Sequence, residues 1–438
     1  MSKMTNHKTY RNCHPVWNLP FVFCRLFVIC FLLFVISAPA HADALANFWL
    51  AKNKVEAPSY ILMDLDSGRI LAQKNIHQRR EPASTTKIMT ALLASESGKL
   101  DQSFTIGSNP PKVGESSMYL EQGEVFTLRQ LVQGTLTKSA NDGCVAIAEA
   151  VSGTVPQFVH LMNLKAKLLG CHDTHFANPN GLHNPNHYTS ANDLAIIARA
   201  ALQDPFIDAT VRIKKITLHG NKKIPLRIFY NHNRLLMHWE KCDGVKTGYT
   251  HQAGRCLVAS ATQTDPATGH QWRLLSVVLH APNCWSDSIN LLQHEGFDLF
   301  QPVRVAEAGK VLTTVKIKGA GAAAEAVAAN DLWLPLRPGE EKYLKAEVHP
   351  LQRSAPLAKG QIVAYISWTE NGHKIAAMPL VANDDVNYST IYRAMNSLKS
   401  LGKNGPIYKS IWVWVGLALL FIFAMFKVNA GKRKRKRR

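Results

Sequence analysis

Two short motifs, far apart in the chain, carry the groups needed for acyl transfer. Ser84 stands three residues before Lys87, and the tripeptide Lys246-Thr247-Gly248 follows much later. Residues three apart on a helix share a face, so the amine of Lys87 can reach the hydroxyl of Ser84. A buried, neutral lysine can accept the proton of a serine, which then becomes a nucleophile. The spacing predicts an active-site serine with a lysine base.

The Lys-Thr-Gly tripeptide occurs once in the sequence and is typical of an anion-binding strand. A lysine and a hydroxyl can hold a substrate carboxylate, and a glycine lets another backbone approach closely. An ordinary strand that ends in a turn is the alternative interpretation. We expect Lys246, Thr247 and Gly248 to lie on an edge strand beside the substrate.

A third motif, Ser-x-Asn, is ambiguous because it occurs three times, at Ser139, Ser190 and Ser288. The first two copies share the string Ser-Ala-Asn-Asp. A serine followed three residues later by an acid, before an apolar helix, also fits a helix cap. Because Ser139 lies nearer to Ser84 and inside a predicted helical insert, we interpret Ser139 and Asn141 as functional and Ser190 as a cap.

Ser-x-x-Lys is also weak by itself, although less so than Ser-x-Asn. It recurs at Ser400 and Lys403, and Ser84 could be a helix N-cap behind Pro82. The combination is more specific, because Ser-x-x-Lys, Ser-x-Asn and Lys-Thr-Gly occur in that order on a helix, a helical insert and a late strand. We therefore favour the catalytic interpretation of all three motifs.

The elements that must position these motifs follow from hydrophobic periodicity. Segments with strand-like composition are 60–64, 70–72, 245–249, 255–262 and 272–280. Segments with helical spacing are 86–96, most of 128–202, and 288–294. This order of strands, helix, helical insert, strands and helix predicts an α+β domain, not alternating βαβ units.

Beyond Pro302 the sequence predicts a different kind of domain. Short β-type segments separated by Gly, Pro, Asn and Ala turns continue to about Val386, which indicates a small all-β domain over 301–386. Residues 387–410 then place apolar side chains at helical spacing among basic ones, which is typical of an amphipathic stem at a membrane surface.

The two ends of the chain predict export and anchoring. Residues 1–42 read as a secretory signal peptide, with an uncleaved signal anchor as the alternative. Residues 411–430 have the length and apolarity of a transmembrane helix, and the basic tail 431–438 is expected in the cytoplasm by the positive-inside rule. The body, beginning with a catalytic domain over 43–300, would then lie on the periplasmic side of the inner membrane.

Charge and cysteine content exclude other classes. The net charge is +20, of which the first 42 residues carry +4 and the last 12 carry +8, so basicity favours membrane orientation over nucleic-acid binding. The sequence contains no nucleic-acid module, and no cofactor is expected. No metal site is expected, and zinc in particular is disfavoured because no Cys-x-x-Cys occurs. The odd number of cysteines beyond the targeting segment requires at least one free or intermolecular thiol: Cys144, Cys171, Cys242, Cys256 and Cys284.

These motifs and their flanks resemble the low-molecular-mass penicillin-binding proteins of the D-alanyl-D-alanine carboxypeptidase type, serine peptidase family S11. The similar blocks are Pro82–Thr90, Ser139–Asp142, Asn178–Leu182, Arg234–Leu236, Asp243–Thr250 and Leu257–Thr262. The resemblance spans about residues 55–300, and the segment to Val386 is similar to the family's C-terminal domain. It implies a β-lactamase/transpeptidase-like fold, with an antiparallel sheet flanked by helices and a helical subdomain.

The resemblance also implies roles for the site residues. Ser84 would attack the bond between two terminal D-alanines of a peptidoglycan stem peptide, with Lys87 accepting its proton. Ser139 would relay a proton to the leaving amine, and Asn141 would orient Lys87 and the substrate. β-Lactams would acylate the same serine and stall.

On the strand side, the resemblance implies that Lys246 and Thr247 bind the substrate carboxylate beside Gly248. The backbone N–H groups of Ser84 and Tyr249 would form the oxyanion hole. A class A β-lactamase is disfavoured, because no Glu-x-x-Leu-Asn element lies between the second and third motifs.

The sequence departs from the family pattern in two places. Family members usually carry an arginine after the last core strand, and residues 281–287 contain none. Endopeptidase action on cross-links, or a membrane-tethered wall-binding protein with little turnover, therefore stay as alternatives. The family's usual anchor is an amphipathic helix, whereas here a hydrophobic span and a polybasic tail follow the stem.

Overall fold

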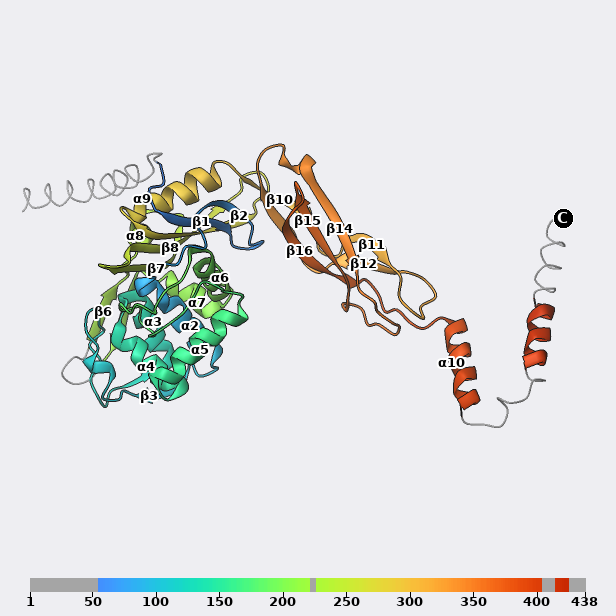
Figure 1. The fold of residues 1–438 in the computed structure, drawn as a ribbon, viewed down its shortest axis with the longest axis horizontal. Coiled ribbons are helices and arrows are strands. Elements are labelled where there is room, and N and C mark those ends of the chain that lie inside the picture. The colour runs from blue at the N-terminus through green and yellow to red at the C-terminus, as the bar shows by residue number, and fades with distance from the viewer. Residues whose placement is uncertain (1–53, 221–225, 404–413, 425–438) are drawn as a thin grey trace, which may run out of the picture. The chain divides into compact units, whose positions relative to one another are not determined.

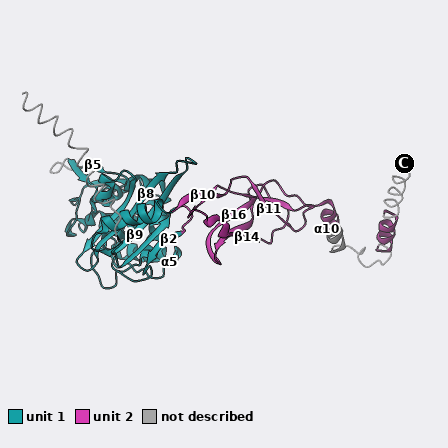
Figure 2. Ribbon diagram, turned by 90° about the horizontal axis from the view of Figure 1, so that it is seen from above, with its two compact units in different colours: residues 1–65, 70–299 teal, residues 66–69, 300–438 magenta. Residues whose placement is uncertain are grey.

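The computed structural model describes residues 54–220, 226–403 and 414–424, which divide into two compact units (Figure 2). Residues 1–65 and 70–299 belong to unit 1, and residues 66–69 and 300–438 belong to unit 2. The predicted signal peptide, 1–42, and the basic tail, 431–438, lie outside the described residues.

A five-stranded antiparallel sheet forms the centre of unit 1, with strand order β2-β1-β9-β8-β7. Its strands are β1 (Ser59–Asp64), β2 (Ile70–Lys74), β7 (Cys242–Thr250), β8 (Gly254–Thr264) and β9 (Gln271–Ala281). Helices pack on both faces of the sheet, so most of β8 and β9 is buried (Figure 1). Strand β7 lies at the edge, as the sequence predicts for Lys-Thr-Gly.

The helical subdomain covers one face of this sheet. Its helices are α2 (Lys87–Glu96), α3 (Leu128–Lys138), α4 (Asn141–Ser152), α5 (Val155–Leu168), α6 (Ala191–Leu202) and α7 (Pro205–Val211). A further short helix, α8 (Arg234–His238), contacts strand β7, and its buried leucines are not part of the core under α2–α7. Helix α2 is central, because Ile88, Met89 and Leu92 belong to the main hydrophobic core and are at most 2% exposed. A short 3-10 turn, η1 (Ala83–Thr86), precedes α2 and carries Ser84.

The opposite face carries α9 (Cys284–Ile289), which continues into the π-helix η3 (Asn290–Phe297). Two hairpins were not anticipated from the sequence: β3 (Ser103–Thr105) with β4 (Val125–Thr127), and β5 (Lys215–His219) with β6 (Leu226–Tyr230). The five cysteines of the described chain are buried and free, so the part of unit 1 described here has no disulfide.

Unit 2 is the expected all-β domain. Two strands, β10 (Gln301–Ala306) and β13 (Leu332–Leu336), form one pair. A second sheet has the order β11-β12-β16-β15-β14, from β11 (Val311–Val315), β12 (Ala324–Ala328), β14 (Leu344–Pro350), β15 (Ile362–Glu370) and β16 (His373–Ala382). Their inward side chains, including Leu334, Val363 and Leu380, form a separate core.

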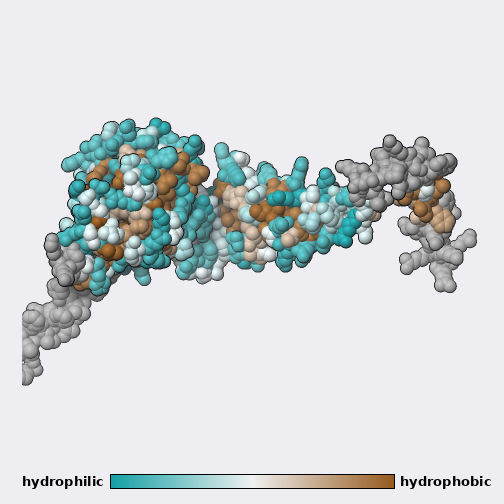
Figure 3. Space-filling view, turned by 90° about the horizontal axis from the view of Figure 1, so that it is seen from below, coloured by the Kyte–Doolittle hydropathy of each residue, from teal (hydrophilic) through white to brown (hydrophobic). Residues whose placement is uncertain are grey.

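The stem forms helix α10 (Thr390–Lys403), on which Ile391 and Met395 are exposed. Residues Trp414–Ala424 form a short apolar helix with exposed side chains, seen as the brown patch between grey segments in Figure 3. Within the described residues, no single helix is both long and apolar enough to span a membrane, although α4 and α5, bent by 84°, qualify as a pair. The transmembrane helix over 411–430 therefore stays a prediction.

Candidate active site

The turn before α2 places the predicted nucleophile beside the predicted base. Lys87 Nζ lies 2.7 Å from Ser84 Oγ, 2.8 Å from Asn141 Oδ1 and 2.7 Å from the carbonyl oxygen of Asn180. A neutral amine has two N–H donors and one lone pair, which match the two oxygen acceptors and the serine O–H. The helix-cap alternative for Ser84 is wrong, because the N-cap positions of η1 and α2 are Pro82 and Thr86.

Lys87 is fully buried, and this burial lowers the pKa of its amine from the ordinary lysine value. Cys144, Glu115 and Asp142 oppose that shift of the Lys87 pKa electrostatically, but by less than burial lowers it. A low-dielectric environment disfavours the charged ammonium, so the neutral amine needed to accept a proton becomes accessible. The geometry and the electrostatics both suit Lys87 as a general base.

The loop Asn178–Leu182 packs against the turn that carries Ser84. A Cβ on Gly181 would lie 1.9 Å from the carbonyl oxygen of Ala83, and Gly181 has a φ of +85°, so only glycine fits this contact. Thr90 Oγ1 on α2 donates to the carbonyl of Pro179 at 2.6 Å. These contacts explain the glycine of this block and fix the carbonyl of Asn180 against Lys87.

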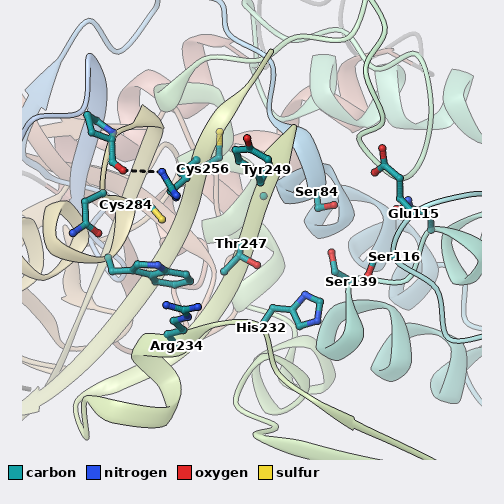
Figure 4. A pocket seen from close by; sticks show the side chains of 16 residues that line it. Ser84, Glu115, Ser116, Ser139, His232, Arg234, Thr247, Tyr249, Cys256 and Cys284 are labelled. Carbon is teal, nitrogen blue, oxygen red and sulfur yellow. Dashed lines mark hydrogen bonds between the residues drawn. The ribbon is translucent and has the colours of Figure 1, made fainter. Parts of the chain in front are cut away.

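The two Ser-Ala-Asn-Asp strings have different structures. Ser139 ends α3 with a left-handed φ of 65°, and Figure 4 shows its side chain near that of Ser84. Ser190 instead caps α6, because its hydroxyl accepts the backbone N–H of Asp193 at 3.2 Å. The interpretation of Ser190 as a cap is confirmed, and the structure places Ser139 and Asn141 at the cleft.

Asn141 and the acid beside it connect α4 to the loop over the cleft. Asn141 Nδ2 donates to the carbonyl of Gly114 at 3.0 Å. The carboxylate of Asp142 accepts the backbone N–H groups of Met118 and Leu120, each at 3.0 Å. The loop that carries Glu115 and Ser116 is thereby fixed to the N-terminus of α4, where the helix dipole favours an acid.

Strand β7 forms the other wall of the cleft. A Cβ on Gly248 would lie 2.9 Å from the carbonyl oxygen of Pro82 and 3.0 Å from the backbone nitrogen of Ser84, so β7 passes directly beside the nucleophile turn. Asp243, at the start of β7, accepts from Arg273 Nη2 at 2.9 Å, which ties the strand to β9. The glycine is therefore required by close approach, as predicted.

Lys246 is 2% exposed, and its Nζ donates to the carbonyl of Thr247 at 3.2 Å. Burial, followed by the charge of Lys87, lowers the pKa of Lys246 to about 7, although Cys144 opposes the shift. Near neutral pH, Lys246 is therefore divided between its charged and neutral forms. An anionic ligand beside it would favour the protonated form.

The cleft between these walls has a volume of about 690 Å³ and contains Ser84, Ser139, Asn141, Thr247, Gly248 and Tyr249. It also contains residues that the sequence analysis did not assign to the site: Glu115, Ser116, His232, Arg234, Arg255 and Trp285. Figure 4 shows His232, Thr247 and Ser139 around the same opening. Of these, Arg255 could have been found from the sequence. A short turn joins the Lys-Thr-Gly strand to the next strand, and this turn places Arg255 opposite Tyr249.

His232 lines the cleft as an exposed residue. Partial desolvation, and then the charges of Lys246, Lys138 and Lys87, lower the pKa of His232 to about 4. His187, behind the nucleophile turn, is buried, and this burial above all lowers its pKa to about 4. Its Nδ1 accepts from Ala177 N–H at 3.0 Å, so its Nε2–H faces Thr86 Oγ1 at 2.8 Å.

The comparisons with known proteins agree with this geometry. Residues 46–283 match the family model of D-alanyl-D-alanine carboxypeptidase, peptidase S11, and residues 300–388 match that of the penicillin-binding protein 5 C-terminal domain. The chain is 33% identical over 365 residues to D-alanyl-D-alanine carboxypeptidase DacA of Haemophilus influenzae, covering 79% of this chain and 89% of that protein. Its identity to DacA of Escherichia coli K12 is 34% over 370 residues, covering 79% and 88%.

A solved structure extends the likeness to three dimensions. Penicillin-binding protein 5 of Haemophilus influenzae superposes with a TM-score of 0.64 at 34% identity, covering 76% of this chain and 98% of that one. The family resemblance inferred from the motifs is confirmed, as is the transpeptidase-like α+β fold followed by a β domain.

Proposed function

The chain belongs to the D-alanyl-D-alanine carboxypeptidase family, peptidase family S11, and we propose that it removes the terminal D-alanine from peptidoglycan stem peptides. The observation that carries the proposal is the 2.7 Å contact between Ser84 Oγ and a fully buried Lys87 amine. This pair supplies a nucleophile and a base in one place, as a serine acyl-transfer enzyme requires.

In the acylation step, Ser84 Oγ forms a bond to the carbonyl carbon of the penultimate D-alanine while Lys87 accepts the serine proton. The tetrahedral oxyanion is stabilised by the backbone N–H groups of Ser84 and Tyr249, which β7 and η1 bring together. Collapse breaks the peptide bond, and Ser139 passes a proton to the departing amine. The terminal carboxylate, which belongs to the departing D-alanine, interacts with Lys246 and Thr247.

In the second step, water attacks the ester carbonyl of the acyl-enzyme. Lys87, neutral again after its proton has passed to the leaving group, is placed to activate that water. Asn141 supports both steps, because its Oδ1 accepts from Lys87 at 2.8 Å. A β-lactam would form the same ester on Ser84 and would be released slowly, because its leaving group remains attached.

A second activity is favoured by one departure from the family pattern. The loop 281–287, which lines the cleft with Pro282, Asn283 and Trp285, contains no arginine. Without a cation there, a substrate whose terminal carboxylate is replaced by a longer chain would be less disfavoured. Cleavage of D-alanyl cross-links between stem peptides is therefore the alternative to removal of a terminal D-alanine.

The proposal includes a location, which rests on the sequence pattern. The signal-peptide pattern of 1–42 would export the chain, and the apolar segment 411–430 with the basic tail 431–438 would anchor it to the inner membrane. Both catalytic and β domains would then face the periplasm, where stem peptides occur. The exposed apolar side chains of Trp414–Ala424 support an anchoring role.

The activity is tested with the full-length protein in detergent and two substrates, a stem pentapeptide and a cross-linked dimer. Release of D-alanine from the pentapeptide by the wild type, and none by Ser84→Ala, is the expected result. Cleavage of the dimer at a higher kcat/KM would select the endopeptidase alternative. If neither substrate is turned over and labelled penicillin fails to bind, the enzymatic proposal is wrong.

A further inference from the structure

The active-site cleft continues beyond Thr247 to two arginines, Arg234 and Arg255, which both line it. Figure 4 shows Thr247 between Ser139, on one side, and Arg234 with Cys284, on the other. Among the described residues, neither arginine forms an ion pair with a carboxylate. The cleft therefore contains cationic groups, although the loop 281–287 supplies none.

Arg255 is held by the sheet and by a hydrogen bond of its guanidinium. It lies on β8, directly opposite Tyr249 of β7, and its Nη1 donates to the carbonyl of Pro282 at 3.1 Å. Groups carried by the strands of a sheet are held more firmly than groups on loops. A guanidinium has five N–H donors in a planar fork, so one hydrogen bond to Pro282 leaves donors for a ligand.

We propose that Arg255 recognises the free C-terminal carboxylate of the substrate, in place of an arginine on the loop 281–287. The inference rests on the proposed function and specifies its substrate: peptides that end in a free carboxylate are preferred to peptides whose end is amidated or extended. Thr247 and Arg255 line the same cleft as Ser84, so the threonine hydroxyl and the guanidinium would share the carboxylate.

The other cations are less suited to direct contact at the open end of the cleft. Lys246 is 2% exposed and already donates to the carbonyl of Thr247, so it attracts the carboxylate by its charge from behind strand β7 and offers few free donors. Arg234 is the first residue of the five-residue helix α8, and no side-chain hydrogen bond fixes its guanidinium among the described residues. Arg255 alone of these three combines strand placement, exposure and a fixing contact.

The test compares two probes on the full-length protein, diacetyl-L-Lys-D-Ala-D-Ala and the same peptide with a C-terminal amide. The wild type is expected to prefer the carboxylate. Arg255→Gln should lower kcat/KM for the carboxylate peptide by about 10- to 100-fold and change that for the amide by less than about threefold. Arg255→Lys, which keeps the charge and loses the fork, should give an intermediate ratio.

Arg353→Gln is the matched control. Arg353 of unit 2 is also exposed, and its guanidinium also donates to a backbone carbonyl, that of Ile362 at 3.2 Å. The Arg353→Gln variant loses the same charge and should leave the ratio of kcat/KM for the carboxylate peptide to that for the amide unchanged. Thermal unfolding of each variant shows whether the domain stays folded.

Three results would overturn the assignment. Equal losses on both probes in Arg255→Gln would indicate a structural role, and loss of discrimination in Arg234→Gln alone would assign the subsite to Arg234. A wild type that turns over both probes with equal kcat/KM has no carboxylate subsite, although its D-alanyl peptidase activity stands. No turnover of either probe by the wild type would contradict the proposed function itself.

Discussion

The cleft has a helical wall around Lys87 and a strand wall formed by β7 and β8, and the two walls differ in the burial and hydrogen bonding of their cations. On the helical wall, Lys87 has no exposure and is held by three oxygen atoms from three segments of the chain. On the strand wall, and within the described residues, Lys246 donates one hydrogen bond, and the exposed Arg255 donates one to a backbone carbonyl. The amine of the helical wall has all its hydrogen-bond partners without a ligand, whereas the strand wall has cationic groups to which a ligand can bind.

This difference separates bond-making from recognition. A base must be desolvated and aligned before the substrate arrives, since a preorganised group needs no rearrangement during the reaction. On the strand wall, the exposed Arg255 keeps its charge at all accessible pH values, whereas the buried Lys246 keeps its charge when an anion binds beside it. Changes on the helical wall should therefore reduce kcat, and changes on the strand wall should act more on KM.

The largest effect is expected from Lys87→Arg. Arginine stays protonated at all accessible pH values, so the variant cannot accept the proton of Ser84. Acylation by a labelled penicillin should slow by about 10³-fold or more. Lys87→Met, which removes the charge without burying a guanidinium, is the control for folding. Acylation of either variant at the wild-type rate would exclude Lys87 as the base.

The next effect contrasts two serines in identical strings. Ser139→Ala should lower kcat for D-alanine release by about 10²- to 10³-fold, because a group that relays a proton at the cleft is lost. Ser190→Ala should leave kcat unchanged and lower the free energy of unfolding by about 1 kcal/mol, because a helix cap is lost. Steady-state kinetics and urea unfolding check both. Reversed outcomes would show that the two serines have been assigned to the wrong roles.

A smaller effect is expected where the walls touch. Gly248→Ala places a Cβ against the backbone of Pro82 and Ser84, so β7 must move away from the nucleophile turn. A displacement of this kind should lower kcat/KM by about 10²-fold. Gly321→Ala of unit 2, where no atom comes nearer than 3.5 Å, is the matched control. Wild-type kinetics in Gly248→Ala would mean that the walls are not in close contact.

The smallest effect concerns pH. Burial and the charge of Lys87 lower the pKa of Lys246 to about 7, so the protonated form that attracts a carboxylate is lost as pH rises above 7. KM for a carboxylate-terminated peptide should therefore rise on the alkaline side, by about 10-fold between pH 6 and 8.5. Lys246→Gln should raise KM at pH 6 and make it independent of pH. A wild-type KM that falls with rising pH would contradict the sign.

On the acid side, the lowered pKa of Lys87 predicts a fall in kcat. Protonation of its amine removes the base, so kcat should decrease as pH drops through the Lys87 pKa. This limb should persist in Lys246→Gln, because it belongs to the helical wall. Two limbs that disappear together would show that the lysines titrate as one coupled pair.

Much of the fold could be predicted from the sequence, because its strongest elements have clear periodicity. The strand pair around Asp64, the helix behind Lys87 and the three strands from Val245 to His280 were each recognised from local patterns. Strand β12 was missed, since its sequence Ala-Glu-Ala-Val-Ala has low β propensity, and pairing with β11 and β16 fixes it instead. The hairpin of β5 and β6 was missed, because no strand was predicted between the helices that end at Leu202 and the strand that begins near Val245.

The motifs located the bond-making wall but not the whole cleft. Ser84, Lys87 and Gly248 stand in short motifs whose spacing has a physical meaning. Asn180 reaches Lys87 through a backbone carbonyl, which its side-chain type does not reveal. Arg255 becomes relevant only through cross-strand pairing with Tyr249. Short sequence motifs reveal residues whose side chains react, such as Ser84 and Lys87. Residues that reach the site through strand pairing or a backbone carbonyl, such as Arg255 and Asn180, are assigned to it by the structure.

The central claim is that Ser84 is the nucleophile of a serine acyl-transfer enzyme. It is tested most directly by incubating the full-length protein with benzylpenicillin, measuring its intact mass and mapping the adduct by peptide mass spectrometry. We predict one penicilloyl group, located on Ser84 and absent from Ser84→Ala. No adduct on the wild type, an adduct on another residue, or equal labelling of Ser84→Ala would contradict the account.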